Sequence, residues 1–266
     1  MKFSSVKLAY FSPTGTTKKI LEGIAEGIGI ERIEHVSMTP PDATTKLLEI
    51  FSDELIVIGA PVYAGRLPVD AVKRFKCFRP HNAIAVLVVV YGNRDYEDAL
   101  LELTNLCKDL GFIAISGAAF IGEHSFHTKD VPIATGRPDN KDIEQAIAFG
   151  QAIRQKISGL RSLSAVAPLR IPGNFPYKDS MHPIAGTPTT LKDICTTCGS
   201  CAEVCPKAAI TVNTIVETDP QLCIKCCACV KECPTNARIM DIPFIKKIAQ
   251  TLSQNCSYRK EPEMFL

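Results

Sequence analysis

Short apolar runs alternate with longer amphipathic segments over the first 158 residues of the chain. The apolar runs are rich in β-branched residues, and the pattern predicts strands at Val6–Phe11, Arg32–Val36, Leu55–Ala60, Ala83–Tyr91 and Phe112–Phe120. The segments between and after them predict helices near Thr16–Ile28, Val69–Phe75, Tyr96–Leu110 and Lys141–Ile157, and a weaker pattern predicts one after Thr44. Strands apolar on both faces that alternate with helices indicate an α/β fold, a doubly wound five-stranded parallel sheet covered on both sides.

The pattern changes after residue 158. Prolines interrupt every possible helix between 159 and 190, which predicts an extended connector. A cysteine-rich segment follows, and a short amphipathic stretch predicts a closing helix at Pro243–Ser253. We therefore expect an α/β domain at 1–158, a linker at 159–190, a small α+β cysteine-rich domain at 191–240, and a C-terminal helix and tail at 241–266.

Composition narrows the class of protein. The 266 residues exceed the usual size of one domain, about 100–200 residues, and the net charge of +2 offers no basic field for nucleic acid. The longest apolar run, Ala83–Tyr91, is far shorter than the roughly 20 residues that span a bilayer. With no secretory pattern at the N-terminus, we expect a cytoplasmic protein without a membrane span, in which clustered cysteines are metal ligands rather than disulfides.

Most of the twelve cysteines lie in two copies of one motif, CxxCxxCxxxCP. This is the spacing of two-cluster bacterial ferredoxins, in which the fourth cysteine of each run ligates the other cluster. One 4Fe-4S cluster is then expected on Cys195, Cys198, Cys201 and Cys233, and the other on Cys223, Cys226, Cys229 and Cys205.

Zinc ligands and a disulfide framework are two other interpretations of these cysteines. Zinc sites use two CxxC pairs without a CxxCxxC triplet, and a reducing compartment disfavours a disulfide framework. Cys227 is expected to be a spectator, although it could exchange roles with Cys226. Cys77 and Cys107 lie in apolar patterns typical of core cysteines, and Cys256 has no assigned role.

The loop after the first predicted strand reads "FSPTGTTKKI" and opens a helix. Hydroxyl groups and free amides at a helix N-terminus form a neutral cradle for a phosphate, although the same pattern can be an ordinary N-cap. The loops after the third and fourth strands, Gly59–Pro68 and Val89–Leu100, each carry a tyrosine among small residues. They suit a flat aromatic ring held between Tyr63 and Tyr96, and ordinary turns are the alternative.

These loops resemble those of flavodoxins, whose phosphate loop T/S-x-T-G-x-T holds FMN without a cationic side chain. The whole chain, with "YGNRDYEDAL", "GEHSF", "ATGRPDNKD" and "IPGNFPYK", resembles the ferredoxin-flavodoxin fusion proteins of anaerobic bacteria and archaea. The resemblance implies a flavodoxin-like domain with FMN, a bacterial ferredoxin-like domain with two 4Fe-4S clusters, and electron transfer with redox partner proteins; a homodimer is compatible with it. The residues expected at the FMN are Ser12, Thr14, Gly15, Thr16, Thr17, Pro61, Val62, Tyr63, Ala64, Gly65, Arg66, Tyr91, Gly92, Asn93, Arg94, Tyr96 and His124.

One departure from flavodoxins concerns charge. Flavodoxins commonly surround the ring with acidic residues, whereas Arg66 and Arg94 lie in the two ring loops here. Near the ring, their charge would favour the anionic reduced flavin, and electrons would then run downhill from the clusters to FMN. By the same resemblance, Glu123 and His124 approach the flavin.

Three functions fit these features. The first is an iron-sulfur flavoprotein that relays electrons between the clusters and FMN. Such a relay links one-electron transfer at the clusters to two-electron transfer at FMN. The second is a flavin-dependent reductase of a quinone or nicotinamide, which needs an acid near the ring, with His124 and Tyr96 as candidates. The third is a sensor or scaffold, in which the clusters lie out of reach of the flavin.

Overall fold

Five parallel strands form the centre of the protein in a computed structural model, which describes residues 3–43, 46–163, 166–179 and 184–266. The strands are β1 (Ser5–Tyr10), β2 (Ile33–Ser37), β4 (Glu54–Pro61), β6 (Ile84–Tyr91) and β7 (Ile113–Ile121). Their order across the sheet is β2-β1-β4-β6-β7. This is the doubly wound order of the flavodoxin fold, so the predicted fold class is confirmed.

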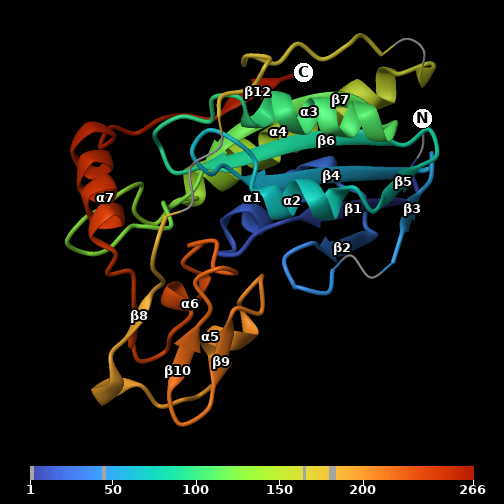
Figure 1. Cartoon of the computed structure of the whole chain (residues 1–266). Helices are drawn as coiled ribbons and strands as arrows, with labels where there is room; N and C mark the ends of the chain where they lie inside the picture. Colours follow the sequence, from blue (N-terminus) through green and yellow to red (C-terminus); the bar gives the residue numbers. More distant parts are fainter. Residues whose placement is uncertain (1–2, 44–45, 164–165, 180–183) are drawn as a thin grey trace.

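Helices cover both faces of the sheet because its strands are apolar on both sides (Figure 1). Helices α1 (Thr16–Ile28) and α4 (Asn140–Gly159) bury one face, and α2 (Val69–Phe75) and α3 (Ala99–Leu110) bury the other. Helices α1 and α4 approach closely through two glycines. A Cβ atom on Gly27 would lie 2.0 Å from the carbonyl oxygen of Ile147, and one on Gly150 2.1 Å from that of Ile24.

The structure adds a strand that the sequence pattern did not predict. Strand β12 (Glu263–Phe265) pairs antiparallel with β7 and extends the sheet to six strands, with Met264 opposite Ala118. The expected "tail" at 241–266 therefore returns to the α/β domain. Three residues are too few to produce a periodic signal, so this pairing could not be inferred from pattern.

The helix expected after Thr44 is wrong in the part that the structure describes. Residues 48–50 form the short strand β3 (Leu48–Ile50), which pairs in parallel with β5 (Phe78–Pro80). Thr44 and Thr45 themselves lie outside the described residues. The apolar side of β3 packs on the core through Ile50, which is 1% exposed. Tertiary packing therefore determines that this segment is a strand rather than a helix.

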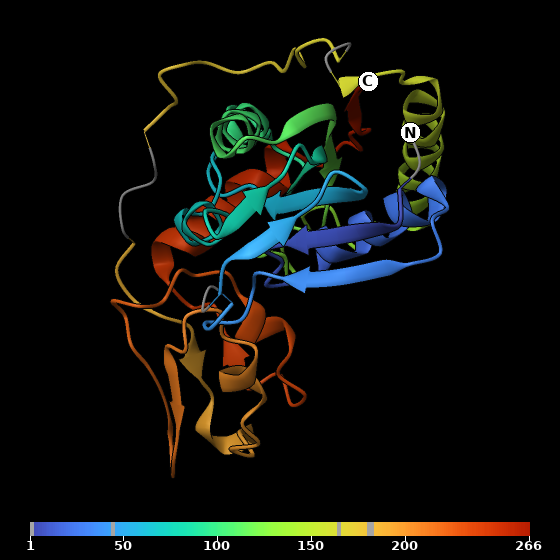
Figure 2. The ribbon, with the colours of Figure 1, turned by 90° about the vertical axis from the view of Figure 1, so that its right-hand side faces the viewer.

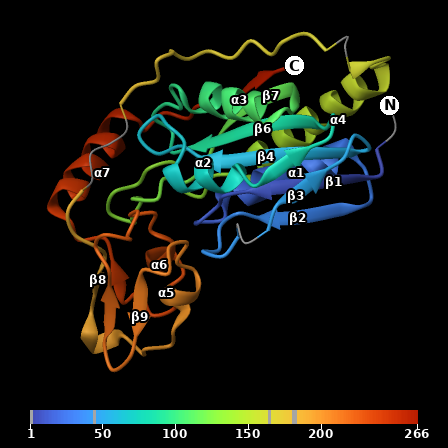
Figure 3. The ribbon, with the colours of Figure 1, turned by 45° about the vertical axis from the view of Figure 1, so that its right-hand side comes forward.

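Residues 166–179, which follow α4, run extended along the outside of the α/β domain (Figure 2). The module holds the hairpin β9 (Ile210–Val212) and β10 (Val216–Thr218), the pair β8 (Thr189–Thr190) and β11 (Arg238–Ile239), and the short helices η2 (Lys192–Ile194), α5 (Ser200–Glu203) and α6 (Ala228–Lys231). Figure 3 shows the module at one end of the α/β domain, with helix α7 (Pro243–Asn255) beside both. Within the described ranges, no helix has the length and apolar character needed to cross a membrane.

Candidate functional site

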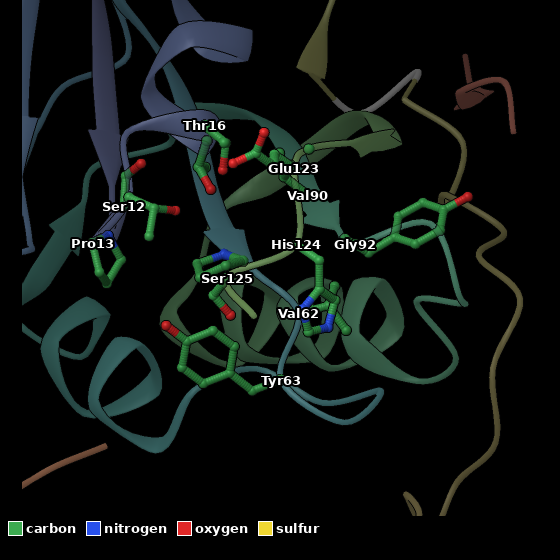
Figure 4. A pocket seen from close by; sticks show the side chains of 15 residues that line it. Ser12, Pro13, Thr16, Val62, Tyr63, Val90, Gly92, Glu123, His124 and Ser125 are labelled. Carbon is green, nitrogen blue, oxygen red and sulfur yellow. The ribbon is translucent and has the colours of Figure 1, made fainter. Parts of the chain in front are cut away.

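A pocket lies where four parallel strands end, on the side at which doubly wound folds bind ligands (Figure 4). The loops after β1, β4, β6 and β7 all contribute to it. Its lining consists of Ser12, Pro13, Thr14, Thr16, Thr17, Pro61, Val62, Tyr63, Val90, Tyr91, Gly92, Gly122, Glu123, His124 and Ser125. The structure thus gathers residues from the three loops described above around one cavity, together with Glu123 and His124 from the loop after β7, which the resemblance placed near the flavin.

The loop after β1 is shaped to expose polar groups. Gly15 has a φ of 80°, which favours glycine, and it caps the start of α1. The hydroxyl of Ser12 accepts a hydrogen bond of 3.1 Å from the amide of Lys18. The hydroxyl oxygen of Thr17 is buried and has no hydrogen-bond partner among the described residues. A buried unpaired hydroxyl at a helix N-terminus fits an anionic ligand that the chain itself does not supply.

The two rings expected to clasp a flavin are placed differently. Tyr63 lines the pocket, and Figure 4 shows its ring opposite Ser12 and Thr16. The Tyr96 ring instead packs on Tyr91, with centroids 5.6 Å apart, and its hydroxyl donates a 2.7 Å hydrogen bond to Glu263. The structure therefore brings Tyr63, but not Tyr96, to the cavity wall.

The two arginines of the ring loops also lie outside the pocket lining. Arg66 makes a bidentate ion pair with Glu102, with both distances 2.8 Å, and its guanidinium lies 4.7 Å from the ring centroid of Tyr177 in the linker. Arg94 donates a 2.8 Å hydrogen bond to Glu97. The expectation that both arginines lie against the ring therefore has no contact to support it. Gly15, Ala64, Gly65 and Asn93 also lie outside the lining.

His124 is half-buried in the pocket wall, and its ring orientation is set by a hydrogen bond. Its Nδ1 accepts a 3.0 Å hydrogen bond from the amide of Phe126. A Cβ on Gly92 would lie 2.2 Å from the ring, so glycine is needed there. Burial, together with the charges of Lys231 and Arg94, lowers the pKa of His124 to about 4. The imidazole is therefore neutral near pH 7, with its proton on Nε2.

The cysteines surround two separate cavities. One is bordered by Cys195, Cys198, Cys201 and Cys233, and the other by Cys205, Cys223, Cys226 and Cys229. Each set contains the fourth cysteine of the opposite motif, as the spacing predicts. Equivalent backbone amides donate to these two exchanged sulfurs: Ala209 to Cys205 at 3.3 Å and Ala237 to Cys233 at 3.2 Å. Amide hydrogen bonds of this kind stabilise cluster-ligating thiolates.

Cys227 borders the second cavity as well. It is 1% exposed, adopts a left-handed conformation with a φ of 62° at the start of α6, and its Sγ approaches the carbonyl oxygen of Lys225 at 3.7 Å. Its role as a spectator stays a prediction. Cys77 and Cys107 are buried in the core of the α/β domain, remote in sequence from both sets.

The second cysteine cavity faces the α/β domain. Lys207, two residues after Cys205, forms an ion pair of 2.6 Å with Asp70, and Arg74 donates to the carbonyl of Pro206. Ile224 packs against the core of the α/β domain. These contacts join residues distant in sequence, so only the folded chain could reveal them.

Tyr63 of the pocket lies within electrostatic range of the second cysteine set. Burial raises the pKa of the Tyr63 hydroxyl, and nearby Cys226 and Cys227 raise it further. Lys231, between Cys229 and Cys233 in the sequence, also pairs at 2.7 Å with Glu123 of the pocket lining, so the second motif approaches the pocket.

Comparison with known family models identifies the cysteine motifs. The family model "4Fe-4S binding domain" matches residues 188–211 and 216–239, which contain the two motifs. Among curated proteins, none matches this chain.

Solved structures resemble the α/β part. A flavodoxin from the domain Archaea is 15% identical and covers 58% of this chain and 99% of its own, with a TM-score of 0.38. A flavodoxin of Streptococcus pneumonia TIGR4 is 17% identical and covers 57% and 99%, with a TM-score of 0.41. Rubredoxin oxygen:oxidoreductase from Desulfovibrio gigas is 14% identical and covers 59% of this chain but 37% of its own, with a TM-score of 0.42. By its strand order and its matched motifs, the chain joins a flavodoxin-like α/β domain to a paired 4Fe-4S binding domain of the ferredoxin type.

Proposed function

We propose that the protein is an electron-transfer iron-sulfur flavoprotein that relays electrons between two 4Fe-4S clusters and FMN. The observation that carries this proposal is the ion pair of 2.7 Å between Glu123, which lines the pocket, and Lys231, which lies between Cys229 and Cys233 in the sequence. A flavin in the pocket and a cluster on the second cysteine set would then be neighbours.

The pocket suits FMN in its polar and apolar parts. The hydroxyls of Ser12, Thr14 and Thr16 and the unpaired hydroxyl of Thr17 would hold the phosphate, together with free amides at the start of α1. Tyr63 and Val62 provide the surface for an aromatic ring. When bound, FMN supplies the ability to accept one or two electrons.

The cysteine sets suit 4Fe-4S clusters, which exchange single electrons. Each set offers four thiols around one cavity, and backbone amides already donate to Cys205 and Cys233. The first set includes Cys198, which is exposed, whereas three cysteines of the second set, Cys223, Cys226 and Cys229, are partly or fully buried. We propose that redox partner proteins exchange electrons at the first set and that the second set serves the flavin.

The reductase alternative is less well supported, because both acid candidates are engaged elsewhere. The hydroxyl of Tyr96 donates to Glu263, and its pKa is raised by burial and by that hydrogen bond. His124 is neutral and accepts a hydrogen bond at Nδ1, and a neutral imidazole is a very weak acid. The ion pairs of Lys231 with Glu123 and of Lys207 with Asp70 likewise favour the relay over a scaffold in which clusters and flavin are far apart.

Rapid mixing tests the relay. Anaerobically purified protein that carries FMN and both clusters is mixed with a one-electron donor, and the absorbance of the clusters and of the flavin is followed. We expect the flavin to be reduced within the same molecule, at a rate independent of protein concentration. Cys226→Ser should slow this phase while FMN remains bound. Flavin reduction at an unchanged rate in Cys226→Ser protein that has lost its second cluster would contradict the relay.

A further inference from the structure

One charged side chain of the cysteine-rich module reaches the flavin pocket. Lys231, the last residue of α6, donates from Nζ to Oε1 of Glu123 at 2.7 Å and to the carbonyl oxygen of His127 at 3.2 Å. Glu123 belongs to the α/β domain and lines the pocket. The ion pair therefore crosses between the two modules at the ligand site.

From its own domain, Glu123 receives a hydrogen bond from the amide of Gly136 and has His127 nearby. Burial raises the pKa of Glu123, but the hydrogen bonds from Lys231 and from the amide of Gly136, at 2.9 Å, outweigh burial and lower it overall. His127 lies 3.7 Å from the second carboxylate oxygen, and its own pKa is lowered by burial. The full positive charge that pairs with Glu123 comes from Lys231.

Glu123 also lies close to the predicted phosphate loop. Figure 4 shows its carboxylate beside Thr16, and a Cβ on the preceding Gly122 would lie 3.0 Å from the Cβ of Thr16. Among the described residues that line the pocket, Glu123 alone bears a charge at neutral pH, because His124 is neutral. Without Lys231, the wall next to the phosphate loop would carry an uncompensated negative charge.

We propose that Lys231 of the cysteine-rich module completes the anion site of the flavin pocket by compensating the charge of Glu123. The inference rests on the proposed FMN function and deepens it, because the two modules then bind one phosphate-bearing ligand together. An unpaired carboxylate beside the phosphate would repel it in a partly desolvated site, where charges interact more strongly than in water. FMN would therefore be held most tightly when the module with its clusters is docked.

A matched set of variants tests this on the full chain with its clusters. Lys231→Gln removes the compensating charge, and Lys207→Gln is the control, since Lys207 pairs across the same interface with Asp70, which lies outside the pocket lining. The dissociation constant of FMN is measured by fluorescence quenching, with riboflavin as the ligand that lacks the phosphate. Iron content and the cluster spectra are recorded for each variant, because Lys231 lies between Cys229 and Cys233 in the sequence.

We expect Lys231→Gln to weaken FMN about tenfold, equivalent to about 1.4 kcal/mol. The affinity of Lys231→Gln for riboflavin should fall by a smaller factor. Lys207→Gln should bind FMN as tightly as the wild type does. Glu123→Gln should bind FMN more tightly than the wild type. The double variant Glu123→Gln, Lys231→Gln should bind FMN with close to wild-type affinity, because neither member of the pair is then charged. Lys231→Arg keeps the charge and should retain the affinity.

A second measurement needs no flavin. Lys231 contributes to the lowered pKa of His124. In the flavin-free protein, NMR titration should show a higher pKa for His124 in Lys231→Gln than in Lys207→Gln. Equal FMN affinities in these two variants would overturn the inference and leave the proposed function intact. A wild-type protein that binds riboflavin and FMN equally, or neither, would overturn the FMN assignment itself.

Discussion

The hydroxyl of Tyr96 donates a 2.7 Å hydrogen bond to the carboxylate of Glu263, and so fastens the last strand of the chain to a loop beside the pocket. The loop makes further contacts of the same kind. The side-chain amide of Asn93 donates hydrogen bonds to the carbonyl oxygens of Cys256 and Tyr258, both at 2.7 Å. Residues 256–266, which follow helix α7, therefore pack on the α/β domain.

Tyr96→Phe should lower the free energy of unfolding by about 1–2 kcal/mol, since it removes a hydrogen bond to a charged group. Urea denaturation of the full chain, followed by circular dichroism, measures the change. Tyr258→Phe is the control, because this side chain is 61% exposed; it should change stability by less than about 0.5 kcal/mol. Equal losses in the two variants would show that the Tyr96 hydroxyl has no special role in fastening the strand.

Thr17→Val should separate ligand binding from stability. The Thr17 hydroxyl is buried without a partner, so its replacement by a methyl group should leave the flavin-free protein equally stable or up to about 1 kcal/mol more stable. FMN should bind about tenfold more weakly, because one donor to the phosphate is lost. Thermal unfolding without flavin and titration with FMN measure the two effects. A variant that loses stability but binds FMN normally would place Thr17 in the core rather than in the ligand site.

The sequence predicted the elements that carry strong periodicity and missed those set by distant contacts. Helix α1 (Thr16–Ile28) and helix α2 (Val69–Phe75) lie where the pattern placed them, because each alternates a buried and an exposed face. Strand β12 was missed because three residues show no period, and it forms only by pairing with β7.

The same limit applies to the site. Loop spacing placed Ser12 and Tyr63 at the pocket, since ligand sites follow strand ends in this fold. It could not indicate that Arg66 would turn to Glu102, or that a lysine between two cluster cysteines would reach Glu123. The partners of these long charged side chains are set by the tertiary structure. The local sequence pattern therefore cannot predict them.

Anaerobically purified protein should contain about eight iron and eight acid-labile sulfide per chain. Cys198→Ala should lose the cluster of the first cavity, because Cys198 is one of its four thiols. Cys227→Ala should keep both, since the second cavity has four other cysteines. Iron analysis and electron paramagnetic resonance of the reduced protein provide the measurement. Stoichiometric zinc in place of iron would contradict the cluster assignment.

The stability of the protein should depend on pH through His124. Its pKa is about 4 in the folded protein and about 6.5 in an unfolded chain, so between these values the unfolded state binds more protons. The stability that depends on neutral His124 is therefore fully present above pH 6.5 and is lost as the pH falls toward 4. Burial is the main cause, and the positive charges of Lys231, Arg94 and His127 act in the same direction.

His124→Asn cannot titrate, so its unfolding free energy should fall less than that of the wild type between pH 6.5 and 4. Urea denaturation at a series of pH values gives the difference between the two proteins, in which the contribution of the carboxylates cancels. His35→Asn is the control, because the His35 side chain is 41% exposed and lies outside the pocket lining, with Glu22 at 4.0 Å and the hydroxyl of Tyr10 at 3.4 Å. It should follow the wild-type curve. Parallel curves for His124→Asn and the wild type would mean that His124 is protonated as readily in the folded protein as in the unfolded chain, and would contradict the lowered pKa of His124.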